Sequence, residues 1–145
     1  MKNGTWVVVA DGRKVLYLHN HGDNDFIDLR VLDHREQVNP PTRDQGTDQP
    51  GRAYDGTGPG RSAMEAADWH QIAEDRFARQ VAADIEAARA AGRFRHLVLV
   101  APPKALAEIR AHLRKETIRD HVVAEINKDL TNHPLDKLEK LLARL

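Results

Sequence analysis

The sequence contains no cysteine, which excludes a disulfide framework, a Cys-ligated zinc site and a thiol nucleophile. It also lacks an apolar run of about 18 residues, the length that predicts a membrane-spanning helix. The first residues hold one lysine and a short apolar run that Asp11 and Gly12 interrupt, a pattern unlike a signal peptide. We therefore expect a cytoplasmic protein that contacts no membrane.

A net charge is absent as well, because 22 Lys and Arg residues balance 22 Asp and Glu residues. No global positive field attracts nucleic acid, so any RNA contact has to be local. The length of 145 residues is that of one ordinary domain and allows a core without disulfides. We expect a single α/β domain over residues 1–145.

Five segments have the composition of β-strands. Residues 5–10 and 13–19 flank Asp11 and Gly12, a pair typical of a two-residue type I′ hairpin. A third strand is predicted over residues 26–32, after a turn at residues 22–24. The uninterrupted apolar run at 97–101 is typical of a central parallel strand, and residues 122–126 predict a fifth strand.

Three helices are predicted between these strands. Ser62 and Glu65 fit a capping box that opens a long helix ending at Gly92. Its core face is an apolar stripe with a spacing of about four residues, made of Trp69, Ala73, Phe77, Val81, Ile85 and Ala88. Two prolines at 102 and 103 start the second helix. Thr131 or Asn132 caps the last helix, with Pro134 in its first turn.

The predicted order of elements is β-β-β-α-β-α-β-α. Hairpin adjacency and right-handed crossovers then favour a sheet with the strand order 3-2-1-4-5, in which only strand 2 is antiparallel to the rest. This is a five-stranded mixed sheet with three helices, the ribonuclease-H-like arrangement of the α/β class.

Residues 37–62 show no periodicity and hold four of the seven prolines and five of the nine glycines. A loop of this length in a compact domain is usually functional or disordered. Glycines let a backbone approach a ligand, a helix start attracts anions, and arginines bind phosphate. The residues predicted to bind are Arg43, Asp48, Arg52, Gly58, Gly60, Arg61 and Ser62. A linker that ends in a good helix cap explains the same pattern about equally well.

Lys128 and Asp129 follow the last predicted strand and join the binding residues, because α/β sheets bind ligands at the carboxyl ends of parallel strands. A strand end followed by a helix cap is the simpler interpretation. Asp11, Asp68 and Asp129 are an alternative set of metal ligands, as in a metal-dependent nuclease or phosphoesterase. Since Asp11 is better explained by the hairpin turn, we expect neither a metal nor a cofactor.

The chain resembles the bacterial "host attachment protein" family over nearly its whole length. The resemblance rests on the Phe77 helix and on four motifs, which are Trp-Val-Val-Val-Ala-Asp-Gly at 6–12, Gly-Thr-Asp-Gln-Pro-Gly-Arg at 46–52, Leu-Val-Leu-Val-Ala-Pro at 97–102 and Lys-Asp-Leu-Thr at 128–131. The family name implies a role in attachment to host cells, through a protein partner.

More distantly, residues 6–113 resemble the central domain of archaeal and eukaryotic class-1 release factors and of Pelota, the ribosome-rescue protein. In release factors a Gly-Gly-Gln motif promotes peptidyl-tRNA hydrolysis just before the long helix. Here Arg61 stands at the position of the glutamine, and Pro59 replaces a glycine. The resemblance to Pelota, which lacks the motif and acts by binding, therefore implies a non-catalytic module of translation whose partners are tRNA or the ribosome. The sequence does not indicate an oligomeric state.

Overall fold

The computed structural model describes the backbone of residues 1–37 and 59–144, and their side chains except those of 59–68. One mixed sheet has the strand order β3-β2-β1-β4-β5. Its strands are β1 (Trp6–Ala10), β2 (Lys14–Asn20), β3 (Leu29–Glu36), β4 (Leu97–Val100) and β5 (Val122–Ile126). Only β2 is antiparallel to the rest. The predicted strand order and the ribonuclease-H-like α/β class are confirmed.

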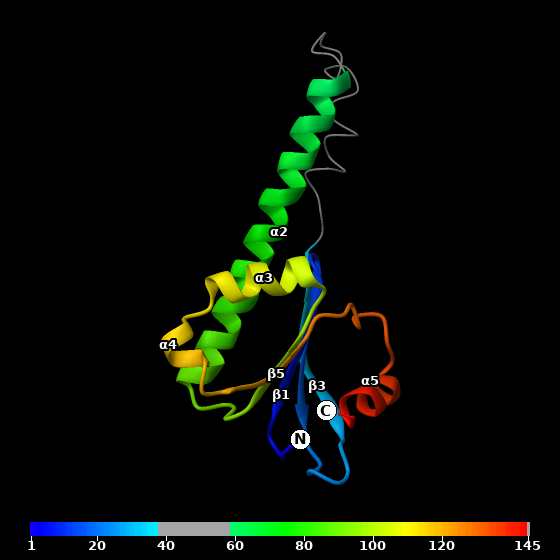
Figure 1. Ribbon diagram of the computed structural model, residues 1–145, viewed down its shortest axis with the longest axis vertical. Helices are drawn as coiled ribbons and strands as arrows, with labels where there is room; N and C mark the ends of the chain where they lie inside the picture. Colours follow the sequence, from blue (N-terminus) through cyan, green and yellow to red (C-terminus); the bar gives the residue numbers. More distant parts are fainter. Residues whose placement is uncertain (38–58, 145) are drawn as a thin grey trace.

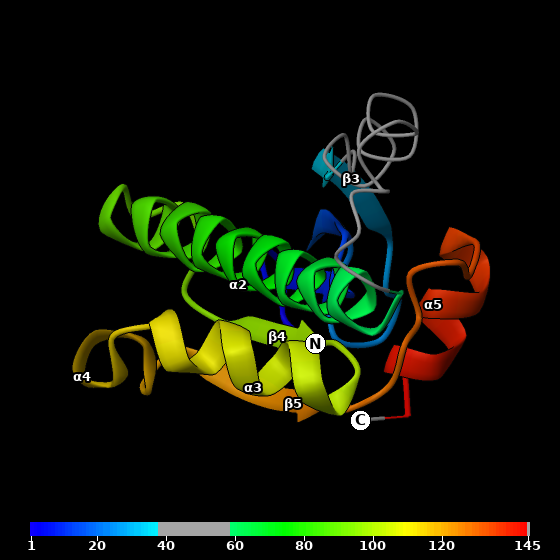
Figure 2. The same ribbon diagram turned by 90° about the horizontal axis from the view of Figure 1, so that it is seen from above.

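Four helices lie within the described residues, one more than predicted. They are α2 (Pro59–Ala90), α3 (Pro103–His112), α4 (Lys115–Ile118) and α5 (Leu135–Leu142). Figure 2 shows α2 and α3 side by side and α5 on the opposite side of the sheet. No helix in the part of the chain that the structure describes is both long and apolar enough to cross a membrane.

The core has two halves, one on each face of the sheet. Trp6, Val8 and Tyr17 pack against the buried side of α2. Val7 and Val9 point the other way and pack against Leu138 and Leu142 of α5. Every residue of β1 is buried because this central strand is covered on both faces. The strand therefore provides a rigid base for the residues that follow its carboxyl end.

The long helix α2 packs on the sheet with only part of its predicted stripe. Phe77, Val81, Ile85 and Ala88 are buried as predicted, whereas Trp69 and Ala73 are only half-buried. Figure 1 shows why, because the amino-terminal part of α2 extends beyond the sheet. This end of the helix is held away from the body of the domain.

Both ends of α2 can be compared with the prediction. The carboxyl end is confirmed, since Gly92 has a φ of 71° and the N–H of Arg93 donates to the carbonyl of Ala88, which is a Schellman motif. The capping box at Ser62 is wrong. The helix already begins at Pro59, because a proline at the first helical position loses no hydrogen bond, and Ser62 lies inside the helix.

The third strand begins later than predicted, at Leu29 instead of residue 26. Two side chains hold residues 20–28 in a compact turn. Asn20 Oδ1 accepts the N–H groups of Gly22 and Asp28, and Asp23 Oδ1 accepts those of Asp25 and Phe26. Phe26 is consequently 80% exposed and outside the ladder. Such local side-chain hydrogen bonds compete with strand pairing.

The turn between β1 and β2 is not the predicted type I′ turn at Asp11 and Gly12. A type I′ turn needs positive φ at both central residues, and among the described residues only Gly4 and Gly92 have positive φ. Asp11 Oδ1 instead accepts the N–H groups of Arg13 and Lys14, at 2.7 and 2.8 Å. The aspartate side chain therefore stabilises the turn.

The start of α5 also differs from the prediction. Its N-cap is Pro134, not Thr131 or Asn132, and Pro134 precedes the first turn instead of lying in it. Thr131 is buried and its hydroxyl contacts two carboxylates, as described below. Leu138 and Leu142 form the buried face of α5, while Leu135 is exposed.

Candidate functional site

Asp11 and Asp129, far apart in the sequence, meet at the carboxyl end of the parallel strands. Thr131 Oγ1 lies 2.7 Å from Asp129 Oδ1 and 3.1 Å from Asp11 Oδ2. The hydroxyl has a single proton, and the shorter distance indicates that it donates to Asp129. Thr131 is 7% exposed. Its hydroxyl therefore lies between the loop after β1 and the loop after β5.

A shallow hollow of about 270 Å³ opens beside this contact, lined by the β1–β2 turn, by α2 and by the start of α3. Lys104 and Glu74 form an ion pair across it, with Nζ 3.4 Å from Oε2. Gly12 lies against the same carboxylate, since a Cβ at position 12 would come within 3.3 Å of Glu74 Oε2. Since Asp11 and Glu74 balance Arg13 and Lys104, the hollow is polar but carries no excess of positive charge.

The structure positions only some of the predicted binding residues. Lys128 and Asp129 lie in the exposed loop between β5 and α5. Gly60, Arg61 and Ser62 lie in the first turns of α2, and their side chains are outside the described ones. The other four predicted binding residues lie outside the described residues altogether, and these are Arg43, Asp48, Arg52 and Gly58. The binding role of the residues from Arg43 to Ser62 therefore stays a prediction.

The structure describes the side chains of two of the three alternative metal ligands. Asp11 and Asp129 converge on Thr131, and the side chain of Asp68 lies outside the described ones. No group of three or more His, Cys, Asp and Glu residues that could hold a metal ion occurs among the residues that the structure describes. The local hydrogen bonds explain the position of Asp11 without a metal.

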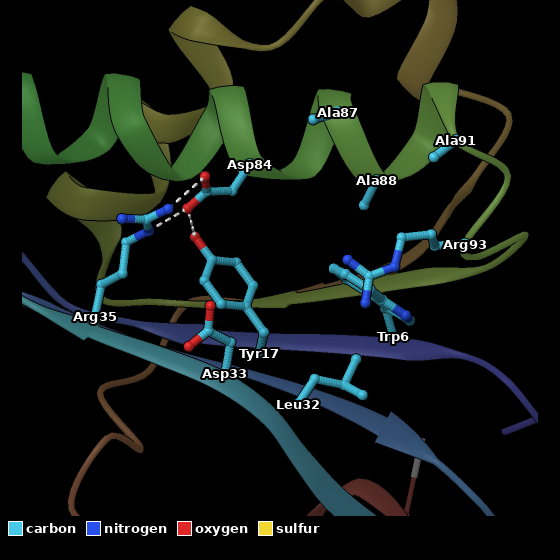
Figure 3. Close-up of a pocket in the computed structure, with 10 residues that line it drawn as sticks. All are labelled: Trp6, Tyr17, Leu32, Asp33, Arg35, Asp84, Ala87, Ala88, Ala91 and Arg93. Carbon is cyan, nitrogen blue, oxygen red and sulfur yellow. Dashed lines mark hydrogen bonds and ion pairs between the residues drawn. The ribbon is translucent and has the colours of Figure 1, made fainter.

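A second hollow, of about 390 Å³, lies between α2 and the strands β1, β2 and β3 (Figure 3). Asp84 of α2 is its polar centre and accepts hydrogen bonds from the Tyr17 hydroxyl at 2.7 Å and from Arg35 Nε and Nη2 at 2.7 and 3.1 Å. At the other end the Arg93 guanidinium lies over the Trp6 ring, with its carbon 5.1 Å from the ring centroid. These contacts join the edge of the sheet to the long helix.

The titration of these groups follows from the same contacts. Burial, reinforced by the hydrogen bond to Asp84, raises the pKa of Tyr17 above its ordinary value. The hydrogen bond to Asp84 also raises the pKa of Arg35. Tyr17 thus remains a neutral donor and Arg35 a cation at any physiological pH. Asp33 and Asp84 lie beside Arg35 in this hollow, so it has no excess of positive charge to attract an anion, and Arg93 lines a further hollow as well.

Sequence reasoning missed the cluster of Tyr17, Arg35 and Asp84. The alternation of β2 places Tyr17 on the same face as Val15, but nothing local pairs its hydroxyl with a helix residue 67 positions away. Arg35 lies beyond the predicted end of the third strand. A correct strand boundary is the signal that would have placed Arg35 opposite Val15, on the face that α2 covers.

Comparison of the sequence with known protein families gives a match. The family model described as "Bacterial archaeo-eukaryotic release factor family 12" matches residues 4–142, which is nearly the whole chain. No curated protein matches the chain.

Proposed function

Because the chain belongs to bacterial archaeo-eukaryotic release factor family 12, we propose that it is a non-catalytic, release-factor-like module that contacts tRNA or ribosomal RNA. The resemblance to the central domain of release factors is the basis of the RNA part of this proposal. The arginine at position 61, where release factors carry the hydrolytic glutamine, supports binding without hydrolysis.

The observation that carries the proposal is the extension of α2 beyond the sheet (Figure 1). Arg61 is in the first turn of this helix, and Arg43 and Arg52 precede it in the sequence. The first N–H groups of a helix have no partner within the helix and favour anions, and guanidinium groups bind phosphate through paired hydrogen bonds. A helix start that stands clear of the domain can reach an RNA backbone without a clash from the sheet.

Binding of purified protein to ribosomes and to tRNA at about 50 mM salt tests this proposal, since low salt favours phosphate contacts. We expect the wild type to bind and the variant Arg52→Ala/Arg61→Ala to bind about tenfold more weakly. Each lost phosphate contact weakens binding whatever the nucleotide sequence of the RNA. Lys137→Ala/Lys140→Ala removes the same charge from exposed positions of α5 and is the matched control. Absence of wild-type binding, or equal losses in both variants, would contradict the proposal.

Attachment to host cells, which the other resemblance implies, stays a prediction of that resemblance. Cell fractionation separates the two roles, because a direct adhesin has to be found at the cell surface.

A further inference from the structure

Positive charge is concentrated in one part of this neutral chain. Residues 86–121 hold eight Lys and Arg residues against four Asp and Glu residues, so the rest of the chain has an excess of four acids. This segment runs from the last turns of α2 through α3 and α4. Figure 1 shows α4 beside the carboxyl end of α2, and Glu86 joins them by accepting the N–H of Arg114 at 3.0 Å. Part of this positive segment therefore lies at the carboxyl end of α2, away from the start of the helix at Pro59.

A hollow of about 370 Å³ lies at this end, which we call the amino-end hollow because it adjoins the amino ends of β1 and β4. It is lined by residues 2–4 and 92–96. Lys2, Arg93 and Arg95 contribute three cations, and none of the described lining residues is an acid. None of the three forms an ion pair with a residue that the structure describes. The charges of Lys2 and Arg95 are thus available to a ligand, and Arg93 lies at the border with the hollow between α2 and the strands, which it also lines.

The backbone keeps the hollow open and its cations in place. Gly4 and Gly92 have φ values of 81° and 71°, and a Cβ at either position would meet no atom within 4 Å. The guanidinium of Arg93 is held over Trp6. The carbonyl of Arg95 pairs with His121 Nδ1 at 2.9 Å, which fixes the backbone at this arginine. The two loops therefore present cations around an accessible depression.

We propose that the amino-end hollow binds phosphate groups of an RNA backbone, as a second contact surface of the release-factor-like module. This inference rests on the proposed function. A concave site with two guanidinium groups and one ammonium group suits phosphate, which accepts several charge-assisted hydrogen bonds at once. A membrane surface is a poorer match, because none of the large exposed apolar side chains of the described residues lines the hollow to anchor it in lipid.

Arg61 and the amino-end hollow lie toward opposite ends of α2. The 32 residues of α2 span about 48 Å at 1.5 Å per residue. A mononucleotide cannot reach from Arg61 to Arg95, whereas a folded RNA such as tRNA can. The arrangement thus selects a large RNA over a small phosphorylated ligand.

Charge reversal in the hollow tests the inference, with tRNA as the probe. Lys2→Glu/Arg95→Glu changes two exposed side chains with no described ion pair, and circular dichroism confirms folding. We expect tRNA affinity to fall at least about tenfold at low salt, and the slope of log affinity against log salt to decrease by about 2, one per lost contact. Lys137→Glu/Lys140→Glu on α5 makes the same charge change, and we expect a loss of less than about threefold because distant exposed charges are screened.

The outcomes separate the two proposals. If the wild type binds tRNA and both double variants lose the same affinity, the hollow is not a contact and only this inference fails. If the wild type binds neither tRNA nor ribosomes, the proposed function fails and the inference with it. Displacement of tRNA by polyglutamate of equal charge would identify an acidic protein as the ligand and would also overturn the inference.

Discussion

Raising the salt concentration from 50 to 200 mM is expected to weaken tRNA binding by about 10³-fold, because about six phosphate contacts release their counterions. The six cations are Arg43, Arg52 and Arg61, which the sequence places before or at the start of α2, and Lys2, Arg93 and Arg95 of the amino-end hollow. The measurement is a fluorescence-anisotropy titration of labelled tRNA at several salt concentrations. The expected slope of log affinity against log salt is about −5 for duplex regions.

The slope also distinguishes between the two surfaces. If only Arg43, Arg52 and Arg61 contact phosphate, the slope is about −2.7 and the loss of affinity about 40-fold. Binding that persists with a slope near zero would contradict the account, because recognition would then not use phosphates. The chain has no net charge, so its overall charge cannot produce a steep dependence of affinity on salt. A steep slope would therefore report local phosphate contacts.

Asp84→Ala is expected to lower the free energy of unfolding by about 2–3 kcal/mol. The buried Tyr17 hydroxyl loses its acceptor, which costs about 1–3 kcal/mol when a buried donor is left unpaired. The loss of the ion pair between Arg35 and residue 84 adds little to this cost, because the Arg35 side chain is 47% exposed and water can solvate its charge. Chemical denaturation of the purified variant measures the change.

Tyr17→Phe provides the control for this prediction. In the Asp84→Ala background we expect Tyr17→Phe to recover part of the loss, because it removes the unpaired hydroxyl. The single variant Tyr17→Phe is expected to cost about 1 kcal/mol, the typical net value of one hydrogen bond. A cost below about 0.5 kcal/mol for Asp84→Ala, the size of an ordinary surface substitution, would show that the contacts in Figure 3 do not hold α2 to the sheet.

The sheet could be predicted from the sequence because its strands are marked by apolar composition and its connections obey handedness rules. Residues 122–126 were predicted as a strand and form β5 with the same bounds. The third strand could not be placed correctly, since the side chains of Asn20 and Asp23 determine where pairing starts. The helix α4 was missed because it has only four residues, too few for a periodic pattern.

The candidate sites were predicted less completely, for a related reason. Sequence analysis singled out Asp11 and Asp129 but not the buried hydroxyl of Thr131 that lies between them. The amino-end hollow combines residues 2–4 with residues 92–96. Only the parallel pairing of β1 with β4 brings these segments together. Contacts between distant segments depend on the tertiary fold, which no local pattern reports.

Photo-crosslinking of the protein to tRNA containing 4-thiouridine, followed by peptide mapping, tests most directly the claim that this module contacts RNA through both ends of α2. We predict crosslinks in the peptides around Arg52 and Arg61 and in those spanning residues 92–96. Crosslinks confined to α5, on the other side of the sheet, or no crosslinks at all, would contradict it.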